Sequence, residues 1–477
     1  MHNIMHNILA TVLVQTFCYF LSREAPRVSR PPGPDAPTRL SGWHYQIKQQ
    51  QQQQRVIIGN GGGIPVADYT TTTAAAAITT TATTTSVVAI AKKSSVHFSR
   101  PAMKCFMIPE PGAEGEVRDI PTPAPETDYA LIKVLRAGVC NTDLEILQGY
   151  MGFQGVLGHE FVGRVVEVNS KDEQVKARWT GVRVCGDINL GCATCGVCTN
   201  AFNLDSRCSK MSRNHCPKRT VLGILNKNGT IAEYLTLPII NLHEVPHDMS
   251  DEVAVFSEPL AAACRIVEQG LVRYNERSPD KVAILGDGKL GLMIAEVLGR
   301  EHTSRLGKAA TSYPRPTLFG KHRQKMDLVE ESAGVACHFV AACKDEKAFN
   351  GVSTEYAAKF DVVVDATGSP AGLALAAGLC RPQGTLVLKS TCAAGEHFNA
   401  APFVIDELKV IGSRCGPIDK ALEMLAIDGK KGGEIQPLNI EKYITKTFPL
   451  SEATAAFKCA AEKTTMKVQI ICNEEQT

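Results

Sequence analysis

The sequence from Gly138 to Gly163 reads GVCNTDLEILQGYMGFQGVLGHEFVG and contains the residue types that bind zinc. Cys140 is followed nineteen residues later by His159 and then by Glu160. Thiolate, imidazole and carboxylate groups are the ligands that zinc prefers in proteins. Thr142, two residues after Cys140, would place a hydroxyl beside a metal bound there. The stretch therefore predicts a metal site.

A second group of candidate metal ligands is a cluster of cysteines. The chain has seventeen cysteines, six of them between positions 185 and 216. Cys192, Cys195 and Cys198 have C-x2-C-x2-C spacing, which puts three thiolates on one tight loop and is typical of a structural zinc site. Two residues compete for the fourth ligand position, Cys208 and Cys216. The other cysteines are scattered singly, which favours a reducing compartment over disulfides.

A third stretch, from position 281, has the pattern of a dinucleotide-binding unit. Residues 281–285 read KVAIL, a buried-strand pattern, and run directly into the sequence GDGKLG and a predicted helix at 292–299. The glycines permit a tight turn, the close approach of a pyrophosphate and helix-on-strand packing, and a helix N-terminus favours phosphate charge. The predicted cofactor-binding residues of this loop are Gly286, Asp287, Gly288, Lys289, Leu290 and Gly291.

The end of the next strand predicts which cofactor is bound. The acidic residue expected about twenty residues after the glycines is absent, and residues 303–316, with two prolines, read as an inserted loop. Residues 317–319 read as the second strand, and Gly320, Lys321, His322 and Arg323 follow it. Because cationic groups suit a 2′-phosphate, we expect NADP to be preferred over NAD. An ordinary solvated basic turn is the alternative.

Two patterns of strands predict the fold class. Short apolar strands broken by glycine and proline indicate a barrel-like β domain; they lie at 104–108, 129–137, 161–169 and 183–185. In the second half, strands alternate with helices, which predicts an α/β fold with a doubly wound parallel sheet; these strands lie at 281–285, 361–365, 384–388 and 408–412. Thr367 and Gly368, just after one of them, are further candidate cofactor-binding residues.

The wording GVCNTDLEILQGY…GVLGHEFVGRVVEV resembles the zinc-binding segment of the medium-chain dehydrogenase/reductase superfamily, which includes zinc-dependent alcohol, polyol, glucose and threonine dehydrogenases. The resemblance covers Met103 to the C-terminus. It implies a GroES-like β-barrel catalytic domain followed by a doubly wound Rossmann domain. The expected bounds are 103–260 for the catalytic domain with both zinc sites, 261–412 for the Rossmann domain, and 413–477 for a segment that returns to the catalytic domain.

The resemblance also implies a ligand set for each metal. Residues 257–260 read SEPL, and in the polyol and glucose dehydrogenases a glutamate in this context binds the catalytic zinc. We therefore expect Cys140, His159 and Glu258 as ligands, with Glu160 either a fourth, exchangeable ligand or a supporting group. Cys264 is the competing candidate. The flank Asn-His-Cys-Pro resembles that of the family's fourth structural ligand, which favours Cys216 and makes Cys208 part of an insertion at 200–210.

The implied activity is a hydride transfer between a primary or secondary alcohol, or a polyol, and NAD(P), with two zinc ions per chain. Thr142 is the expected first proton acceptor of a relay. Alcohol dehydrogenases often place a histidine three residues later, where this chain has Glu145. The resemblance therefore leaves open which residue passes the proton on to solvent. The alternatives are a non-enzymatic relative that keeps the fold as a binding or structural protein, and a zinc-free quinone or enoyl reductase.

The first 102 residues do not read as a folded domain. They contain six consecutive glutamines and a threonine/alanine tract, with nine basic and three acidic residues, a composition typical of disordered or targeting segments. We expect a plastid or mitochondrial presequence, or cytoplasmic protein if translation starts at Met103. The chain's net charge of +2 gives no indication of nucleic acid or a membrane as partner. A homodimer or homotetramer that acts on a small-molecule alcohol or polyol is expected.

Overall fold

The computed structural model describes residues 100–199, 212–275, 277–330, 332–340, 356–390, 399–426 and 438–473. All of them belong to one compact unit, which spans residues 94–477. The predicted leader lies outside the described residues except for its last three positions. Arg100 forms an ion pair with Glu167 (2.9 Å), and strand β1 begins at Ala102. The described fold therefore includes three residues that the sequence assigns to the leader.

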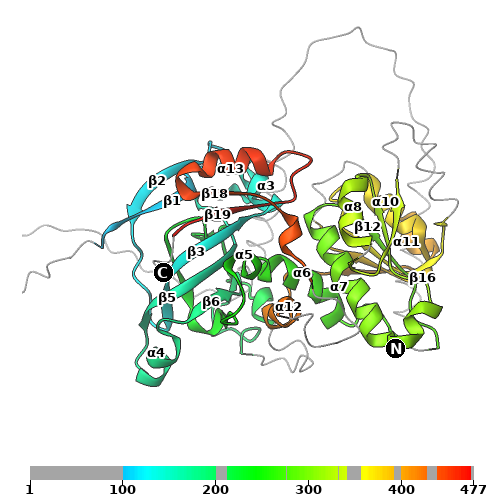
Figure 1. Ribbon diagram of the computed structural model, residues 1–477, viewed down its shortest axis with the longest axis horizontal. Coiled ribbons are helices and arrows are strands. Elements are labelled where there is room, and N and C mark those ends of the chain that lie inside the picture. The colour runs from blue at the N-terminus through cyan, green and yellow to red at the C-terminus, as the bar shows by residue number, and fades with distance from the viewer. Residues whose placement is uncertain are drawn as a thin grey trace, which may run out of the picture. The chain divides into compact units, whose positions relative to one another are not determined.

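The first half of the described chain forms a lobe of β-sheets, which the C-terminal strands complete (Figure 1). Its largest sheet has the order β11-β6-β5-β3-β19-β18, with β10 paired to β3. These strands are β3 (Tyr129–Val139), β5 (Glu160–Asn169), β6 (Arg183–Gly186), β10 (Tyr234–Pro238), β11 (Leu242–Glu244), β18 (Ile444–Pro449) and β19 (Lys467–Ile471). Alternating apolar side chains of these strands face a common core.

Two smaller sheets and three short helices complete this lobe. One sheet has the order β2-β1-β4, and the other β7-β8-β9. Their strands are β1 (Ala102–Ile108), β2 (Glu116–Pro121), β4 (Gly155–Val156), β7 (Asn189–Leu190), β8 (Thr220–Leu222) and β9 (Asn226–Lys227). The helices are α3 (Asn141–Leu147), α4 (Glu173–Trp179) and α5 (Asp251–Ala254).

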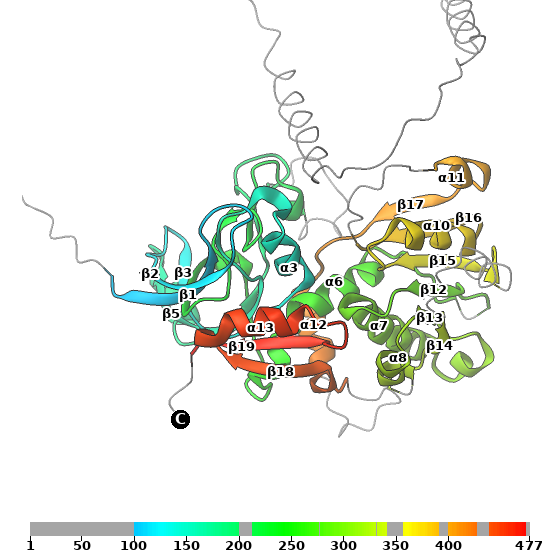
Figure 2. The same ribbon diagram turned by 90° about the horizontal axis from the view of Figure 1, so that it is seen from above.

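The second half contains a parallel six-stranded sheet in the order β14-β13-β12-β15-β16-β17 (Figure 2). Its strands are β12 (Val282–Leu285), β13 (Thr317–Gly320), β14 (Ala336–Phe339), β15 (Phe360–Asp365), β16 (Cys380–Leu388) and β17 (Lys409–Gly412). The helices between them are α7 (Lys289–Leu306), α8 (Arg323–Glu330), α10 (Pro370–Leu379) and α11 (Ala401–Ile405). The strand order reverses beside β12, as in doubly wound sheets, so the predicted fold class is confirmed.

Helix α7 is longer than the sequence predicts. It continues past Gly299 to Leu306, and a 3-10 turn follows at Gly307–Ser312, where an inserted loop is expected. In the sequence, Gly299 indicates the end of a helix. In the structure it lies within α7 and allows a close contact with a neighbouring segment. A Cβ at this position would lie 1.9 Å from the Ala333 carbonyl oxygen, so only glycine allows the close contact.

The two halves are joined by packed helices and by the return segment. Helix α6 (Ser257–Glu268) runs through the predicted domain boundary at 260 and packs against α7 and α12 (Ile418–Leu425). In the return segment, α13 (Ala453–Ala460) lies between β18 and β19 in the chain. Buried Glu296 of α7 accepts a hydrogen bond from Tyr443 and pairs with Lys442 (2.8 Å), which ties helix α7 of the second half to this segment.

Candidate active site and metal centres

Three of the predicted zinc ligands come together where two strands of the large sheet pair. Cys140 directly follows β3, and His159 and Glu160 lie at the start of β5. The register pairs Gly138 with Glu160, which brings the end of β3 beside the start of β5. Ligand atoms of Cys140, His159 and Glu160 all lie within 4.8 Å of one another. A Cβ at Gly138 would lie 2.0 Å from a Glu160 oxygen, so a larger residue there would displace the Glu160 carboxylate.

Asp143 is a residue of this site that the sequence analysis misses. Its carboxylate is fully buried and accepts a hydrogen bond from the Cys140 backbone N–H (2.8 Å). Its other oxygen lies 3.2 Å from His159 Nδ1. Burial alone would lower the pKa of His159, but the charges of Asp143 and Cys140 raise it well above its ordinary value. Asp143 therefore fixes the imidazole so that Nε2 is left for a metal.

Lys467 is a second residue that the sequence analysis misses. Its ammonium group on β19 donates to both oxygens of Glu160, at 2.8 and 2.6 Å. Both side chains are buried. Burial would lower the pKa of Lys467, but the Glu160 carboxylate raises it. The Glu160 carboxylate can thus pair with Lys467 instead of a metal ion. This is compatible with both roles expected for Glu160, an exchangeable metal ligand and a group that supports the ligands.

Glu258 lies in the first turn of α6, outside the group formed by Cys140, His159 and Glu160. Its pKa is raised to about 7, chiefly by burial; the charge of His159 opposes this rise and that of Glu160 adds to it. Cys264 is also outside that group. It lines a separate cavity of about 930 Å³ with Val297 of α7 and Met424 of α12.

The predicted relay residues lie on the helix that follows Cys140. The Thr142 hydroxyl oxygen is 4.0 Å from the Cys140 sulfur, so the hydroxyl does lie beside the ligand group. Glu145 is one turn further along α3 and half-buried, and burial raises its pKa.

The glycine-rich loop lies between the ends of β12 and β15. Gly286 has a left-handed φ of +105°, and a Cβ at Gly291 would lie 1.8 Å from the Gly286 carbonyl oxygen. Gly288, the N-cap of α7, faces open space, which leaves room for a ligand. Thr367 and Gly368 follow β15, and the Thr367 hydroxyl donates to Asp365 (2.7 Å). The predicted loop residues are thus gathered at the carboxyl end of the sheet, Leu290 lying in the first turn of α7.

The glycine-rich loop lies near the metal-ligand group, because its Lys289 lines one small cavity together with Lys467, the partner of Glu160. Lys289, in the first turn of α7, is half-buried, and its ammonium group donates to the Ala460 carbonyl oxygen at 3.5 Å. Burial lowers its pKa, Lys467 lowers it further, and the charges of Cys140 and Glu160 act in the opposite direction. A cation at a helix N-terminus is unfavourable by itself, so this position suits a bound anion.

The three predicted cations after β13 differ in their partners. Asp287 accepts hydrogen bonds from the backbone N–H groups of Lys321 (2.7 Å) and His322 (2.6 Å), and it pairs with the His322 ring (3.0 Å). Arg323 pairs with Asp327 at 2.6 Å and also with Glu330. Among the described residues, Lys321 is the one of the three whose side chain has no acidic partner.

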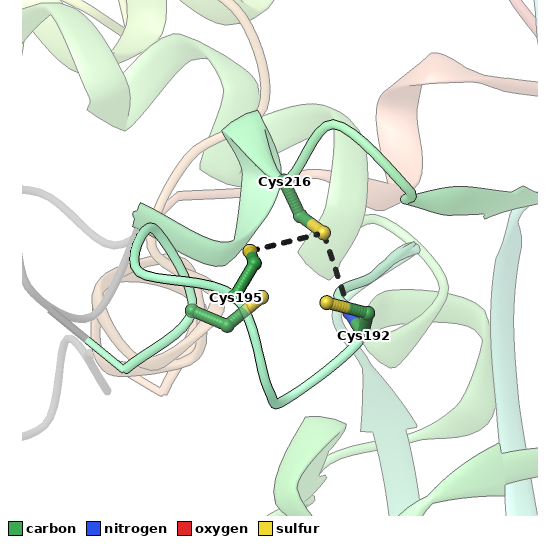
Figure 3. Close-up of side chains that lie close together, drawn as sticks. Cys192, Cys195 and Cys216 are labelled. Atoms are coloured by element: carbon green, nitrogen blue, oxygen red, sulfur yellow. Dashed lines mark hydrogen bonds between the residues drawn. The ribbon is translucent and has the colours of Figure 1, made fainter. Parts of the chain in front are cut away.

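The cysteine cluster forms a compact group of four thiols. Ligand atoms of Cys192, Cys195, Cys198 and Cys216 lie within 4.8 Å of one another. The Cys195 and Cys216 sulfurs are 3.7 Å apart, and the Cys192 backbone N–H donates to the Cys216 sulfur at 3.4 Å (Figure 3). Cys216 is fully buried. Cys208 lies outside the described residues. Four converging thiols fit a tetrahedral structural zinc site.

Comparisons with other proteins agree with these features. Residues 126–247 match the alcohol dehydrogenase GroES-like domain, and residues 310–427 match the zinc-binding dehydrogenase family. Neither match includes the leader, so the predicted presequence has no support from them. Within the part of the chain that the structure describes, no helix has both the length and the apolar character needed to cross a membrane.

Individual relatives cover most of the chain. It is 29% identical over 367 residues to D-arabitol-phosphate dehydrogenase of Enterococcus avium (75% of this chain, 94% of the relative). It is 28% identical over 365 residues to D-altritol 5-dehydrogenase of Agrobacterium fabrum (75% and 95%). A crystal structure of a zinc-binding dehydrogenase from Sinorhizobium meliloti, bound to NADP, superposes with a TM-score of 0.61 at 26% identity (78% and 100%). The chain is thus a dehydrogenase and belongs to the zinc-dependent medium-chain dehydrogenase/reductase superfamily.

Proposed function

We propose that the chain oxidises a polyol, or reduces the corresponding carbonyl compound, with a zinc ion and a nicotinamide cofactor. One observation carries the proposal: Lys467, which pairs with Glu160 of the group formed by Cys140, His159 and Glu160, lines one small cavity together with Lys289 of the glycine-rich loop. A metal held by the first half and a nicotinamide held by the second would therefore meet at one place.

Zinc bound there would lower the pKa of a substrate hydroxyl toward neutrality, and the nicotinamide would accept the hydride. Cys140 and His159 would hold the metal, with Glu258 or Glu160 as the carboxylate ligand. Asp143 keeps the His159 ring in one orientation by its contact at Nδ1. The Thr142 hydroxyl, which lies beside Cys140, would take the proton that the substrate loses. Glu145 would stand at the outer end of that path.

The cysteine group would hold a second zinc ion with no part in the chemistry. Cys192, Cys195, Cys198 and Cys216 supply four sulfur ligands, which leave no open position for a substrate. The expected content is thus two zinc ions per chain. The assembly into a homodimer or homotetramer stays a prediction.

The proposed cofactor preference is for NADP over NAD. No carboxylate directly follows β13, and within the described part of the chain the Lys321 side chain has no acidic partner. The similar Sinorhizobium protein has NADP bound. Asp287 and the carboxylate partners of Arg323 oppose this preference, because they offset part of the positive charge. We therefore expect a preference of about tenfold, from one charge-assisted contact near solvent.

The proposed substrate class is the polyhydric alcohols. Two relatives that cover most of the chain are named for such compounds, one free (altritol) and one phosphorylated (arabitol phosphate). The relatives' names thus agree on a polyol and differ on whether it carries a phosphate.

The test uses the purified full chain with its zinc content measured. Simple alcohols, polyols, polyol phosphates and threonine are offered with NAD or NADP, and formation of the reduced nicotinamide is followed by absorbance. We expect about two zinc ions per chain and turnover of polyols or their phosphates. Activity with quinones or enones in a zinc-free protein would favour a reductase instead. Zinc-loaded protein without turnover of any compound would favour a binding or structural role.

A further inference from the structure

A buried carboxylate joins the helix of the glycine-rich loop to the return segment. Glu296 lies about two turns into α7, and its side chain is fully buried. Its carboxylate accepts a hydrogen bond from the hydroxyl of Tyr443, a buried residue at the end of the 3-10 turn Glu441–Tyr443. It also pairs with Lys442 of the same turn at 2.8 Å. One side chain of the second half thus contacts two consecutive residues of the return segment.

Two further groups of the second half complete this network. Arg300, one turn further along α7, donates to Glu296 at 3.1 Å, and the hydroxyl of Ser332, which follows α8, donates to it at 3.2 Å. Lys442 also donates to Ser332 and to the Leu328 carbonyl oxygen of α8. The Glu296 carboxylate therefore holds α7, the end of α8 and the 3-10 turn together at hydrogen-bonding distances.

The 3-10 turn leads directly into a strand that is paired beside the metal-ligand group. Ile444, the residue after Tyr443, begins β18 and is in register with Lys467 of β19. Lys467 donates to both oxygens of Glu160. Tyr443 and Lys467 also line the same small cavity as Lys289 of the glycine-rich loop. A continuous series of contacts therefore runs from α7 through Tyr443 and Lys467 to Glu160.

The chemistry of this network favours a role in placing the two halves relative to one another. Replacing a buried ion pair by well-packed apolar side chains is often neutral or stabilising, so its burial does not by itself indicate a gain in stability. Apolar contacts are non-directional, whereas hydrogen bonds weaken steeply away from their preferred geometry. Burial and the charge of Glu296 raise the pKa of Tyr443, so its hydroxyl keeps the proton that it donates. The network therefore favours one placement of the return segment on α7.

We propose that Glu296 and Tyr443 are positioning residues, which set the distance between a substrate at the metal and the nicotinamide. This inference rests on the proposed function, in which the first half holds the metal and the loop before α7 holds the cofactor. The hydride passes from the substrate carbon to the nicotinamide, so its rate depends on how closely the two are held. A misplacement of about 1 Å, caused by a change far from the chemistry, can lower the rate about a hundredfold.

The test removes the hydroxyl of Tyr443 and leaves the rest of the network in place. Tyr443→Phe keeps the ring, and Glu296 keeps both of its cations. Turnover of a polyol should fall by about ten- to a hundredfold per cofactor-binding site, with the sites counted by fluorescence titration with NADPH and NADH. Zinc content and the affinity for both cofactors should not change. Tyr356→Phe is the matched control and should alter none of these quantities, because the Tyr356 hydroxyl contacts His338 (3.3 Å) within the second half.

A deuterium isotope effect separates positioning from a purely structural role. The substrate carries deuterium at the reacting carbon, and the isotope effect on kcat should equal or exceed the wild-type value in Tyr443→Phe, because hydride transfer itself is slower. A loss of folded protein would instead lower the number of cofactor-binding sites and leave turnover per site unchanged. Lys442→Met removes the other contact between Glu296 and the 3-10 turn. It should behave in the same way, and it decides if Tyr443→Phe yields no folded protein.

The outcomes distinguish this inference from the proposed function. Unchanged turnover per site in the deciding variant would overturn the inference and leave the proposed function standing. An isotope effect smaller than the wild-type value would do the same, because a step other than hydride transfer would then have become slower. A wild type that binds neither cofactor, or that oxidises no polyol, would overturn the proposed function and this inference with it.

Discussion

The two groups of candidate zinc ligands differ in how they are assembled. The four cysteines of one group come from a single stretch between positions 192 and 216. The other group depends on pairing between β3 and β5, and its Glu160 contacts Lys467, 307 residues further along the chain. One site is local and the other is distributed over the whole fold.

This difference predicts different consequences of damage. Loss of a ligand from the local site removes a cross-link of one loop, so stability should suffer first. Loss of a ligand from the distributed site leaves the strands, the helices and their core in place, so the chemistry should suffer first. Each prediction below tests one side of this contrast.

The largest effect is expected from Cys140→Ala. Turnover should fall by at least about a thousandfold, because the metal supplies several kcal/mol of transition-state stabilisation. Zinc content should drop by one ion per chain, with an unchanged circular dichroism spectrum. Cys380→Ala, which removes a buried thiol of β16 that belongs to neither ligand group, is the control for zinc content. A Cys140→Ala enzyme that keeps its turnover would refute the assignment of the catalytic metal.

The next effect concerns the local site. Cys216→Ser should release the structural zinc and lower the free energy of unfolding by about 4 kcal/mol when free zinc exceeds its Kd a thousandfold. Thermal and denaturant unfolding with and without a chelator would measure it. Cys208→Ser should have little effect. If Cys208→Ser rather than Cys216→Ser releases zinc, the fourth ligand is the other cysteine.

A smaller effect is expected at Asp143, which contacts two ligand residues of the distributed site. Asp143→Asn should lower zinc affinity or kcat by about ten- to a hundredfold, as loss of a partner of a ligating histidine does. Competition with a chelator and steady-state kinetics measure the two quantities. Asp172→Asn, the same change at an exposed cap of α4, should leave both unaltered. No change in either quantity for Asp143→Asn would mean that His159 is positioned without it.

The smallest effect is expected at the cofactor-binding edge, where side chains from separate loops also meet. Lys321→Ala should reduce the NADP preference about tenfold in kcat/KM. Arg323→Ala should reduce it less, because Asp327 and Glu330 already offset the charge of Arg323. Equal or better activity of the wild type with NAD would show that the negative charge of Asp287 has a larger effect on cofactor choice than the positive charge of Lys321.

The sequence predicts those parts of the molecule that depend on short spacing. The family, the fold class and the strands around Cys140 and Gly286 follow from local patterns, and the comparisons confirm the family. Asp143 and Lys467 were missed for different reasons. Asp143 is three residues after Cys140, and an acidic residue at that position of a helix N-terminus is a capping signal. Lys467 has no local signal, because its contact with Glu160 depends on β19 pairing with β3.

The sequence also contains the information needed to predict the ion pair between Arg323 and Asp327 on helix α8. Asp327 is four residues after Arg323, a spacing that places both on one helix face. The length of α7 cannot be predicted from the sequence. A glycine ends a helix in some proteins, and in others it lies within the helix and allows close packing. Gly299 is a packing residue because it contacts the Ala333 carbonyl oxygen. Ala333 lies beyond strand β13 in the chain, so this contact has no local sequence signal.

The position of β19 beside β3 has a consequence for the order of events during synthesis. Glu160 leaves the ribosome 307 residues before Lys467, which at about 5–20 residues per second is roughly 15 to 60 s. For that time the central strand β3 lacks β19, one of its partner strands, and the buried Glu160 carboxylate lacks its cation. The cysteine cluster has all four thiols within a few seconds at the same rate. A nascent chain can therefore take up zinc at the cysteines well before the second metal position is enclosed.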